Sequence, residues 1–256
     1  HASYIRPLKI NFVRMKQDNS GGERLTDILS EQYKNTLPET VLKELTERYP
    51  DQIVFSTSFG LEDQVITDML SRFGLAVQVF TIDTGRLFYE TYKTWQRTLE
   101  KYTLPIKVYY PEQNLLEQML NQKGPFSFYA SKENRVECCH IRKVLPLQRA
   151  LQGKKIWVTG LRAEQSESRK NQSLFQWDGR HQIIKYNPLF LWSLEDVRRY
   201  IKSHNVPYNS LHDKGFPSIG CQPCTRAVRE GEDFRAGRWW WESNSSKECG
   251  LHTISP

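Results

Sequence analysis

The 256-residue sequence lacks long apolar runs, internal repeats and low-complexity blocks. No stretch approaches the ~20 consecutive apolar residues that a membrane-spanning helix needs, so we expect no membrane span. Residues 1–6 show no apolar run after the first charge, so we expect no secretory signal and a cytoplasmic protein. The length suits one full-sized domain with a single core, or at most two small domains.

Cysteine is also scarce, with five residues in the whole chain. An odd number leaves one thiol over in a framework made only of disulfides, and a chain of this length does not need such a framework. In the reducing cytoplasm, metal binding or thiol chemistry is the better use of these side chains.

The balance of charge and apolar residues indicates a globular protein with an anionic partner. Hydrophobic residues make up 38% and charged residues 25%, which is typical of a folded domain. Lys and Arg outnumber Asp and Glu by 36 to 29, for a net charge of +7. The basic residues are spread out, and no helix-turn-helix, RNP motif or zinc-finger spacing is present. We therefore expect no nucleic-acid partner, and we assign the run Trp239–Trp241 to core or interface.

Short apolar strands alternate with helical patterns along most of the chain. The predicted strands are residues 52–58, 77–83, 106–110, 155–160 and 181–186. This alternation predicts an α/β fold with a mainly parallel sheet flanked by helices on both faces. The predicted divisions are a loose N-terminal arm (1–24), the α/β domain (25–232) and a C-terminal tail (233–256).

Unusual polar loops follow three of the predicted strands, where such sheets bind ligands. These loops are residues 56–60, 83–86 and 160–166. Ser56–Gly60 joins a strand to the amino end of a helix, where hydroxyl and backbone N–H groups can hold phosphate, although no Walker sequence follows. Arg162 in the third loop, together with Arg235 and Arg238, adds guanidinium groups that bind phosphate or sulfate oxygens.

Four cysteines form two close pairs, Cys138–Cys139 and Cys221-x-x-Cys224. Two such pairs can hold one metal centre. Structural zinc generally uses pairs with spacers, and an adjacent pair reaches two corners of a cubane more readily, which favours a 4Fe–4S cluster over zinc. A redox dithiol at 221–224 and four unrelated structural thiols are the alternatives.

Cys249, the fifth cysteine, has a different setting. It lies in a short polar segment with Lys247 before it and His252 after it. Nearby positive charge and exposure favour the thiolate, so we predict a reactive thiol. The alternative is an incidental free thiol.

Together these motifs resemble the adenylyl-sulfate reductases of sulfate assimilation, which share a family with the 3′-phosphoadenylyl-sulfate reductases. The resemblance rests on residues 56–63, 82–86, 138–143, 160–162, 220–225, 235–239 and 248–252. It implies an adenine nucleotide alpha hydrolase-like fold of the PP-loop type, with a mobile C-terminal tail. Members of the family are often oligomeric, so we expect a homo-oligomer.

The resemblance also implies a reaction and its residues. Cys249 would attack the sulfate sulfur of adenylyl sulfate, AMP would leave, and an external dithiol, thioredoxin or glutaredoxin, would release sulfite. A 4Fe–4S cluster would be held by Cys138, Cys139, Cys221 and Cys224. The implied substrate-binding residues are Ser56, Ser58, Gly60, Asp83, Thr84, Gly85, Lys143, Gly160, Arg162, Arg235, Arg238 and His252.

Three alternative functions stay open from the sequence. The substrate could be the 3′-phosphorylated form, or the enzyme could accept both forms. An ATP pyrophosphatase-type adenylyl transferase would need a fuller Ser-Gly-Gly-x-Asp-Ser loop, which is absent, and would have no use for Cys249. A nucleotide- or metal-sensing module would bind AMP without consuming adenylyl sulfate.

Overall fold

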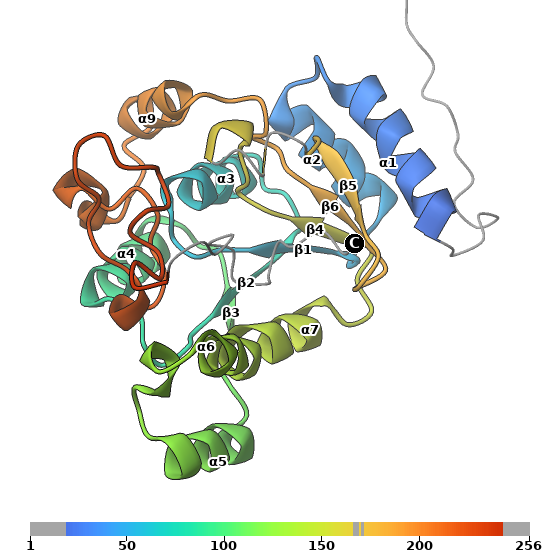
Figure 1. Cartoon of the computed structure of the whole chain (residues 1–256). Coiled ribbons are helices and arrows are strands. Elements are labelled where there is room, and N and C mark those ends of the chain that lie inside the picture. The colour runs from blue at the N-terminus through green and yellow to red at the C-terminus, as the bar shows by residue number, and fades with distance from the viewer. Residues whose placement is uncertain (1–18, 166–168, 170–171, 243–256) are drawn as a thin grey trace, which may run out of the picture.

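A six-stranded sheet forms the centre of the protein, as seen in a computed structural model that describes residues 19–165, 169 and 172–242 (Figure 1). The strand order is β3-β2-β1-β4-β6-β5. The strands are β1 Ile53–Ser56, β2 Gln78–Ile82, β3 Ile106–Tyr109, β4 Ile156–Val158, β5 Phe175–Asp178 and β6 Ile183–Tyr186. All neighbours pair in parallel except β5, which runs antiparallel to β6 at one edge. The mainly parallel sheet predicted from the sequence is confirmed.

The helices separate into groups on the two faces of the sheet. The α-helices are α1 Asn19–Tyr33, α2 Pro38–Arg48, α3 Leu61–Arg72, α4 Tyr89–Lys101, α5 Gln113–Lys123, α6 Lys132–Cys139, α7 Leu145–Leu151 and α9 Leu194–Ser203. A π-helix, His140–Val144, joins α6 to α7. Short 3-10 turns cover Ser127–Tyr129, Ala163–Gln165, Ser210–Lys214 and Gln222–Cys224.

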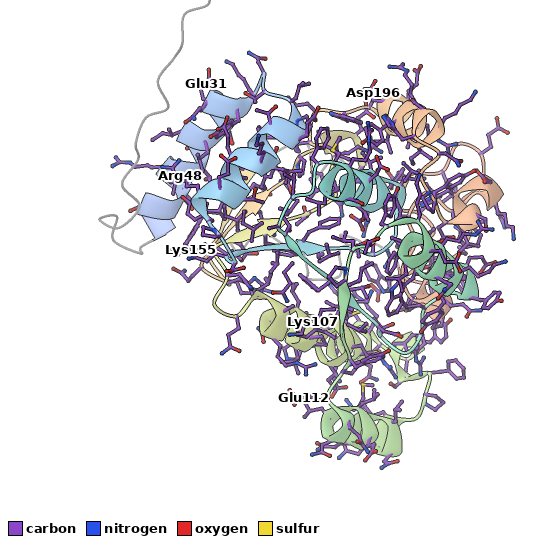
Figure 2. The ribbon with its side chains drawn as sticks, turned by 180° about the vertical axis from the view of Figure 1, so that it is seen from behind. Glu31, Arg48, Lys107, Glu112, Lys155 and Asp196 are labelled. Carbon is purple, nitrogen blue, oxygen red and sulfur yellow. The ribbon has the colours of Figure 1, made fainter. Side chains whose placement is uncertain are left out.

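Successive side chains of a strand point to opposite faces of the sheet, and in this protein both faces pack against helices. On β1, Phe55 packs into a core shared with α1, α2, α3 and α9, while Val54 packs into a second core with Leu147 of α7. Figure 1 shows α2, α3 and α9 on one side of the sheet and α6 and α7 on the other. A strand that is buried on both faces reads as a continuous apolar run, which is why β1 could be recognised from the sequence. Charged side chains such as Glu31, Arg48 and Lys155 lie on the outside (Figure 2).

The first helix begins before the predicted start of the ordered domain. Residues 19–24 were expected in the N-terminal arm, because Gly21 and Gly22 indicate a loop, but they form the first turns of α1. A Cβ on Gly22 would lie 2.3 Å from Cδ2 of Trp177 on β5, so glycine is needed for close packing of this helix on the sheet. The strand that carries Trp177 was also missed, since β5 is a short antiparallel edge.

The start of the predicted C-terminal tail is packed rather than loose. Trp239 is completely buried, and Thr225 forms an isolated antiparallel bridge with Arg238. Residues 233–242 therefore belong to the folded domain, and the expected mobile tail can apply only to 243–256, outside the described residues. Among the helices that the structure describes, none has the length and apolar character to cross a membrane.

Candidate active site

A cleft with a volume of about 240 Å³ lies at the carboxyl ends of the parallel strands. Its walls include the loops that follow β1, β2 and β4, together with residues 217–221, Phe234, Arg235 and Arg238. The predicted site residues that line the cleft are Ser56, Ser58, Gly60, Thr84, Lys143, Gly160, Arg235 and Arg238. The topology thus brings together most of the residues selected from the sequence, because parallel strands present their carboxyl ends at one edge.

The loop after β1 is tied to the helix that follows it. The backbone N–H and the hydroxyl of Ser58 both donate to Oδ2 of Asp63, each at 2.7 Å. Phe59 has a φ of +60° and stacks on Trp95, with ring centroids 5.6 Å apart. A non-glycine residue in this left-handed region is uncommon, and here the Asp63 contacts and the ring stacking hold it.

Asp63 lies at the amino end of α3, inside the wall of the cleft. Burial raises its pKa from 3.8 to about 6, and the two hydrogen bonds from Ser58 oppose this rise without cancelling it. A Cβ on Gly160 would lie 2.2 Å from Oδ1 of Asp63, so the loop after β4 needs glycine to approach α3.

Arg162 has a different position from the one expected. Its Nε donates to Glu62 at 2.7 Å, its Nη1 lies 3.0 Å from Glu164, and its side chain is 1% exposed. It is not among the residues that line the cleft. Arg162 therefore connects the loops after β1 and β4, and its expected contact with a nucleotide stays a prediction.

In the loop after β2, some of the predicted site residues stabilise the loop itself and one lines the cleft. Asp83 accepts hydrogen bonds from the Gly85 N–H at 2.8 Å and from the Tyr92 hydroxyl at 3.0 Å, so it shapes the loop. Gly85 has a φ of +70°, which favours glycine. Neither residue lines the cleft, but Thr84 does, and its hydroxyl lies 3.2 Å from Sγ of Cys221.

Buried cations concentrate at the other end of the cleft. Lys143, Arg235 and Arg238 are 9%, 7% and 5% exposed. Nε of Arg238 is buried without a hydrogen-bond partner among the described residues. A buried donor without a partner is costly, so Nε of Arg238 suits an anion that accepts a hydrogen bond from it.

Several polar residues that line the cleft were not selected as site residues from the sequence. Among them, Arg169 adds another buried guanidinium, and His212 and Ser218 come from a segment with no motif. Burial lowers the pKa of His212, which favours the neutral imidazole. No sequence pattern indicated His212 or Ser218, because their segment reaches the cleft only through the tertiary fold.

The four paired cysteines meet at one place next to this cleft. All four are buried, and they line a second cavity together with Trp239. Cys138 and Cys139 end α6, and the other pair comes from the turn 221–224. Burial raises the pKa of Cys224 to about 12, and the other thiols nearby also raise it. Such thiols need positive partners or a metal before they become thiolates.

The π-helix explains why this region carries both cysteines and cations. A π-turn adds one residue to the helical repeat and is frequent at functional sites. Here it shifts the helix phase after Cys139, so that Arg142 and Lys143 are buried beside the cysteines. Lys143 and Cys221 line both cavities, which places the cysteine cavity directly against the cationic end of the cleft.

The donor set of the cysteine cavity fits the predicted 4Fe–4S cluster, since four thiols line one cavity and such clusters are held by four cysteines. Trp239 also lines this cavity, and its buried indole N–H has no partner among the described residues, so it is a spare donor for a sulfur acceptor there.

Two predicted residues cannot be located. Cys249 and His252 lie outside the described residues. The last described residue before them, Glu242, forms a buried ion pair with Arg135, at 2.7 and 2.8 Å. Arg135 in turn lies over the ring of Trp239, 4.7 Å from its centroid. The described chain is therefore fixed, at Glu242, to the helix that carries Cys138 and Cys139.

Comparisons with known proteins agree with this geometry. Residues 52–227 match the model of the phosphoadenosine phosphosulfate reductase domain. The adenosine 5′-phosphosulfate reductase of Neisseria meningitidis serogroup B is 46% identical over 234 residues, covering 91% of this chain and 93% of its own. The enzyme of the same name from Allochromatium vinosum is 48% identical over 202 residues, covering 79% of each chain.

Solved structures support the fold. Phosphoadenylyl-sulfate reductase from Candida auris, in a phosphate complex, has a TM-score of 0.69 at 27% identity and covers 84% of this chain and 99% of its own. FMN adenylyltransferase from Candida glabrata has a TM-score of 0.52 at 15% identity, covering 89% of this chain and 80% of its own. The latter likeness concerns the fold alone.

Proposed function

The chain belongs to the phosphoadenosine phosphosulfate reductase family and is an oxidoreductase, and we propose that it reduces adenosine 5′-phosphosulfate to sulfite and AMP in sulfate assimilation. The observation that carries this proposal is the contact between two sites. A cleft with a cationic end adjoins a cavity lined by four cysteines, and Lys143 and Cys221 line both. Relatives that are 46–48% identical to this chain are named for that substrate.

The charge distribution supports one orientation of the substrate in the cleft. Glu62 and Asp63 lie at the end formed by the loop after β1, where the guanidinium of Arg162 is already paired with Glu62. Lys143, Arg235 and Arg238 lie at the end near the cysteines. We therefore propose that the nucleoside binds against Ser56–Gly60 and the phosphosulfate binds at the cationic end. This differs from the expectation that Ser56–Gly60 holds phosphate.

The first step of the proposed reaction is a displacement at sulfur. The thiolate of Cys249 attacks the sulfate sulfur, an S–S bond forms, the bond between that sulfur and the phosphate oxygen breaks, and AMP leaves with the electron pair. Lys143, Arg235 and Arg238, together with His252, would stabilise the negative charge that grows on the AMP oxygen.

The second step uses an external dithiol of the thioredoxin or glutaredoxin kind. One thiol attacks the Cys249 sulfur and releases sulfite, and the second thiol resolves the mixed disulfide. Two electrons pass from the dithiol, which becomes a disulfide, and Cys249 returns to its thiol form. An external donor is required because the other four cysteines line their own cavity.

We further propose that Cys138, Cys139, Cys221 and Cys224 hold a 4Fe–4S cluster. When bound, the cluster would supply fixed charge and structural support beside Lys143, since the thiol steps balance without it. The residues around the cavity suit this role, because Arg86, Arg135, Arg142 and Lys143 offset thiolate charge.

Radiolabelled adenosine 5′-phosphosulfate tests the mechanism. The unaltered enzyme should carry radioactive sulfonate before thioredoxin is added and should release labelled sulfite afterwards. Cys249→Ser should retain the iron content and bind AMP but take up no label. Stable labelling of Cys249→Ser would overturn the role of Cys249. Turnover of the 3′-phosphorylated substrate at an equal rate would overturn the preference for the unphosphorylated one.

A further inference from the structure

Ser218 lies between the two arginines of the cationic end. Its Oγ accepts a hydrogen bond from Nη1 of Arg235 and another from Nη1 of Arg238, each at 3.3 Å. Both guanidinium groups are buried, whereas Ser218 is partly exposed and lines the cleft. Both hydrogen bonds are slightly longer than the usual N–H···O range, so each is weak by itself. Ser218 thus fixes the separation of two cations that would otherwise repel each other.

The hydroxyl proton of Ser218 takes no part in the contacts with the two arginines. A serine oxygen has two lone pairs and one proton, and the two arginines use both lone pairs. No described residue accepts the proton of Ser218 in a hydrogen bond, so this donor is available to a ligand in the cleft.

Gly220, two residues later, leaves room for the guanidinium of Arg238 because it has no side chain. A Cβ at Gly220 would lie 2.3 Å from Nη2 and 2.6 Å from Cζ of Arg238. The guanidinium therefore rests against a bare Cα, and an alanine at this position would displace it. Ser218 and Gly220 belong to the segment that ends at Cys221, so this segment links the arginines to the cysteine cavity.

We propose that Ser218 is a binding residue for the anionic group of the substrate. It aligns Arg235 and Arg238 through its oxygen and donates its own proton to the same phosphate or sulfate oxygens. This inference rests on the proposed function, because it assumes that the phosphosulfate binds at the cationic end of the cleft.

Binding of AMP and of adenosine to the full-length, cluster-loaded protein tests the proposal. Calorimetry should show that Ser218→Ala weakens AMP binding about tenfold, as expected for loss of a hydrogen bond to a charged group. Adenosine, which has no phosphate, should bind both forms equally. Ser218→Thr keeps the hydroxyl and should restore AMP affinity. Ser203→Ala, which removes an exposed hydroxyl on α9, is the matched control and should change neither affinity.

The opposite outcomes would overturn the proposal. Equal losses for AMP and adenosine would show that Ser218 only supports the shape of the cleft, and an unchanged AMP affinity would show that it has no role there. Gly220→Ala is an independent variant that displaces Arg238 without altering Ser218, and it should also weaken AMP selectively. The binding assay does not depend on turnover. If Ser218→Ala loses affinity for AMP but not for adenosine, and the unaltered protein does not reduce adenosine 5′-phosphosulfate, then the proposed function is wrong while the role of Ser218 in binding stands.

Discussion

The buried carboxyl group of Asp63 predicts a specific dependence of stability on pH. Asp63 accepts two hydrogen bonds from Ser58, at 2.7 Å each, and burial raises its pKa from 3.8 to about 6. Asp63→Asn keeps a carbonyl oxygen that can accept both hydrogen bonds but removes the ionisable group. The difference in stability between the two proteins therefore isolates the titration of this one carboxyl.

The sign and size of the effect follow from the shift in pKa. Between pH 3.8 and about 6 the folded protein retains a proton on Asp63 that the unfolded chain has released. The folded state of the wild type therefore loses stability as the pH rises through this range, and the loss is complete above it. A shift from 3.8 to about 6 corresponds to about 3 kcal/mol. For a chain of this size that is roughly 10 °C in melting temperature.

Circular dichroism melts of both proteins from pH 4 to pH 8 provide the assay. The melting temperature of Asp63→Asn, relative to wild type, should rise with pH up to about 6 and then stay level. Asp196 is a matched control, because its Oδ2 also accepts from the N–H and hydroxyl of one serine, Ser193, but at an exposed position. Its hydrogen bonds lower the pKa, so Asp196 titrates below the pH range of the melts and the difference for Asp196→Asn should stay nearly level from pH 4 to pH 8. A difference for Asp63→Asn that does not change with pH would refute the reasoning.

Two further substitutions test the ion pair before the C-terminal segment and the close approach of two loops. Glu242→Gln leaves Arg135 buried without a counter-charge, so stability should fall by about 3–5 kcal/mol in thermal melts. The exposed pair of Glu195 is the control: Glu195→Gln should cost less than about 1 kcal/mol, and equal losses would contradict the argument. Gly160→Ala puts a Cβ 2.2 Å from Asp63, and the overpacking should cost about 1–3 kcal/mol. Because this clash lies at the nucleoside end, calorimetry should show similar losses for adenosine and AMP, and a loss confined to AMP would place the nucleoside elsewhere.

The parts of the fold that the sequence predicted well are those in which local pattern and tertiary burial agree. β1 has an apolar run because both of its faces are covered. The predictions were wrong at residues whose type indicates one local structure while their tertiary packing requires another. Gly22 reads as a loop residue but permits a helix to approach Trp177, and β5 is too short to be distinguished from a loop.

For the candidate site as well, some residues could be predicted from the sequence and others could not. Ser58, Lys143, Arg235 and Arg238 could be predicted, because their motifs follow strands or resemble a known family, and all four line the cleft. Arg162 belongs to such a motif as well, but its charge is used by Glu62 within the protein. A motif gives the residue type at a position, and only the neighbours of that residue decide whether its charge faces a ligand.

By itself the sequence determined the chemistry available: two cysteine pairs, a fifth cysteine, several cations, and polar loops placed after parallel strands. Those conclusions need only residue types and spacing, since the carboxyl ends of parallel strands always share one edge. The tertiary structure alone decided which groups meet. It joined the cysteine cavity to the cationic end through Lys143 and Cys221, and it placed Ser218 between two arginines. Such contacts join residues far apart in the chain, and local pattern carries no information about them.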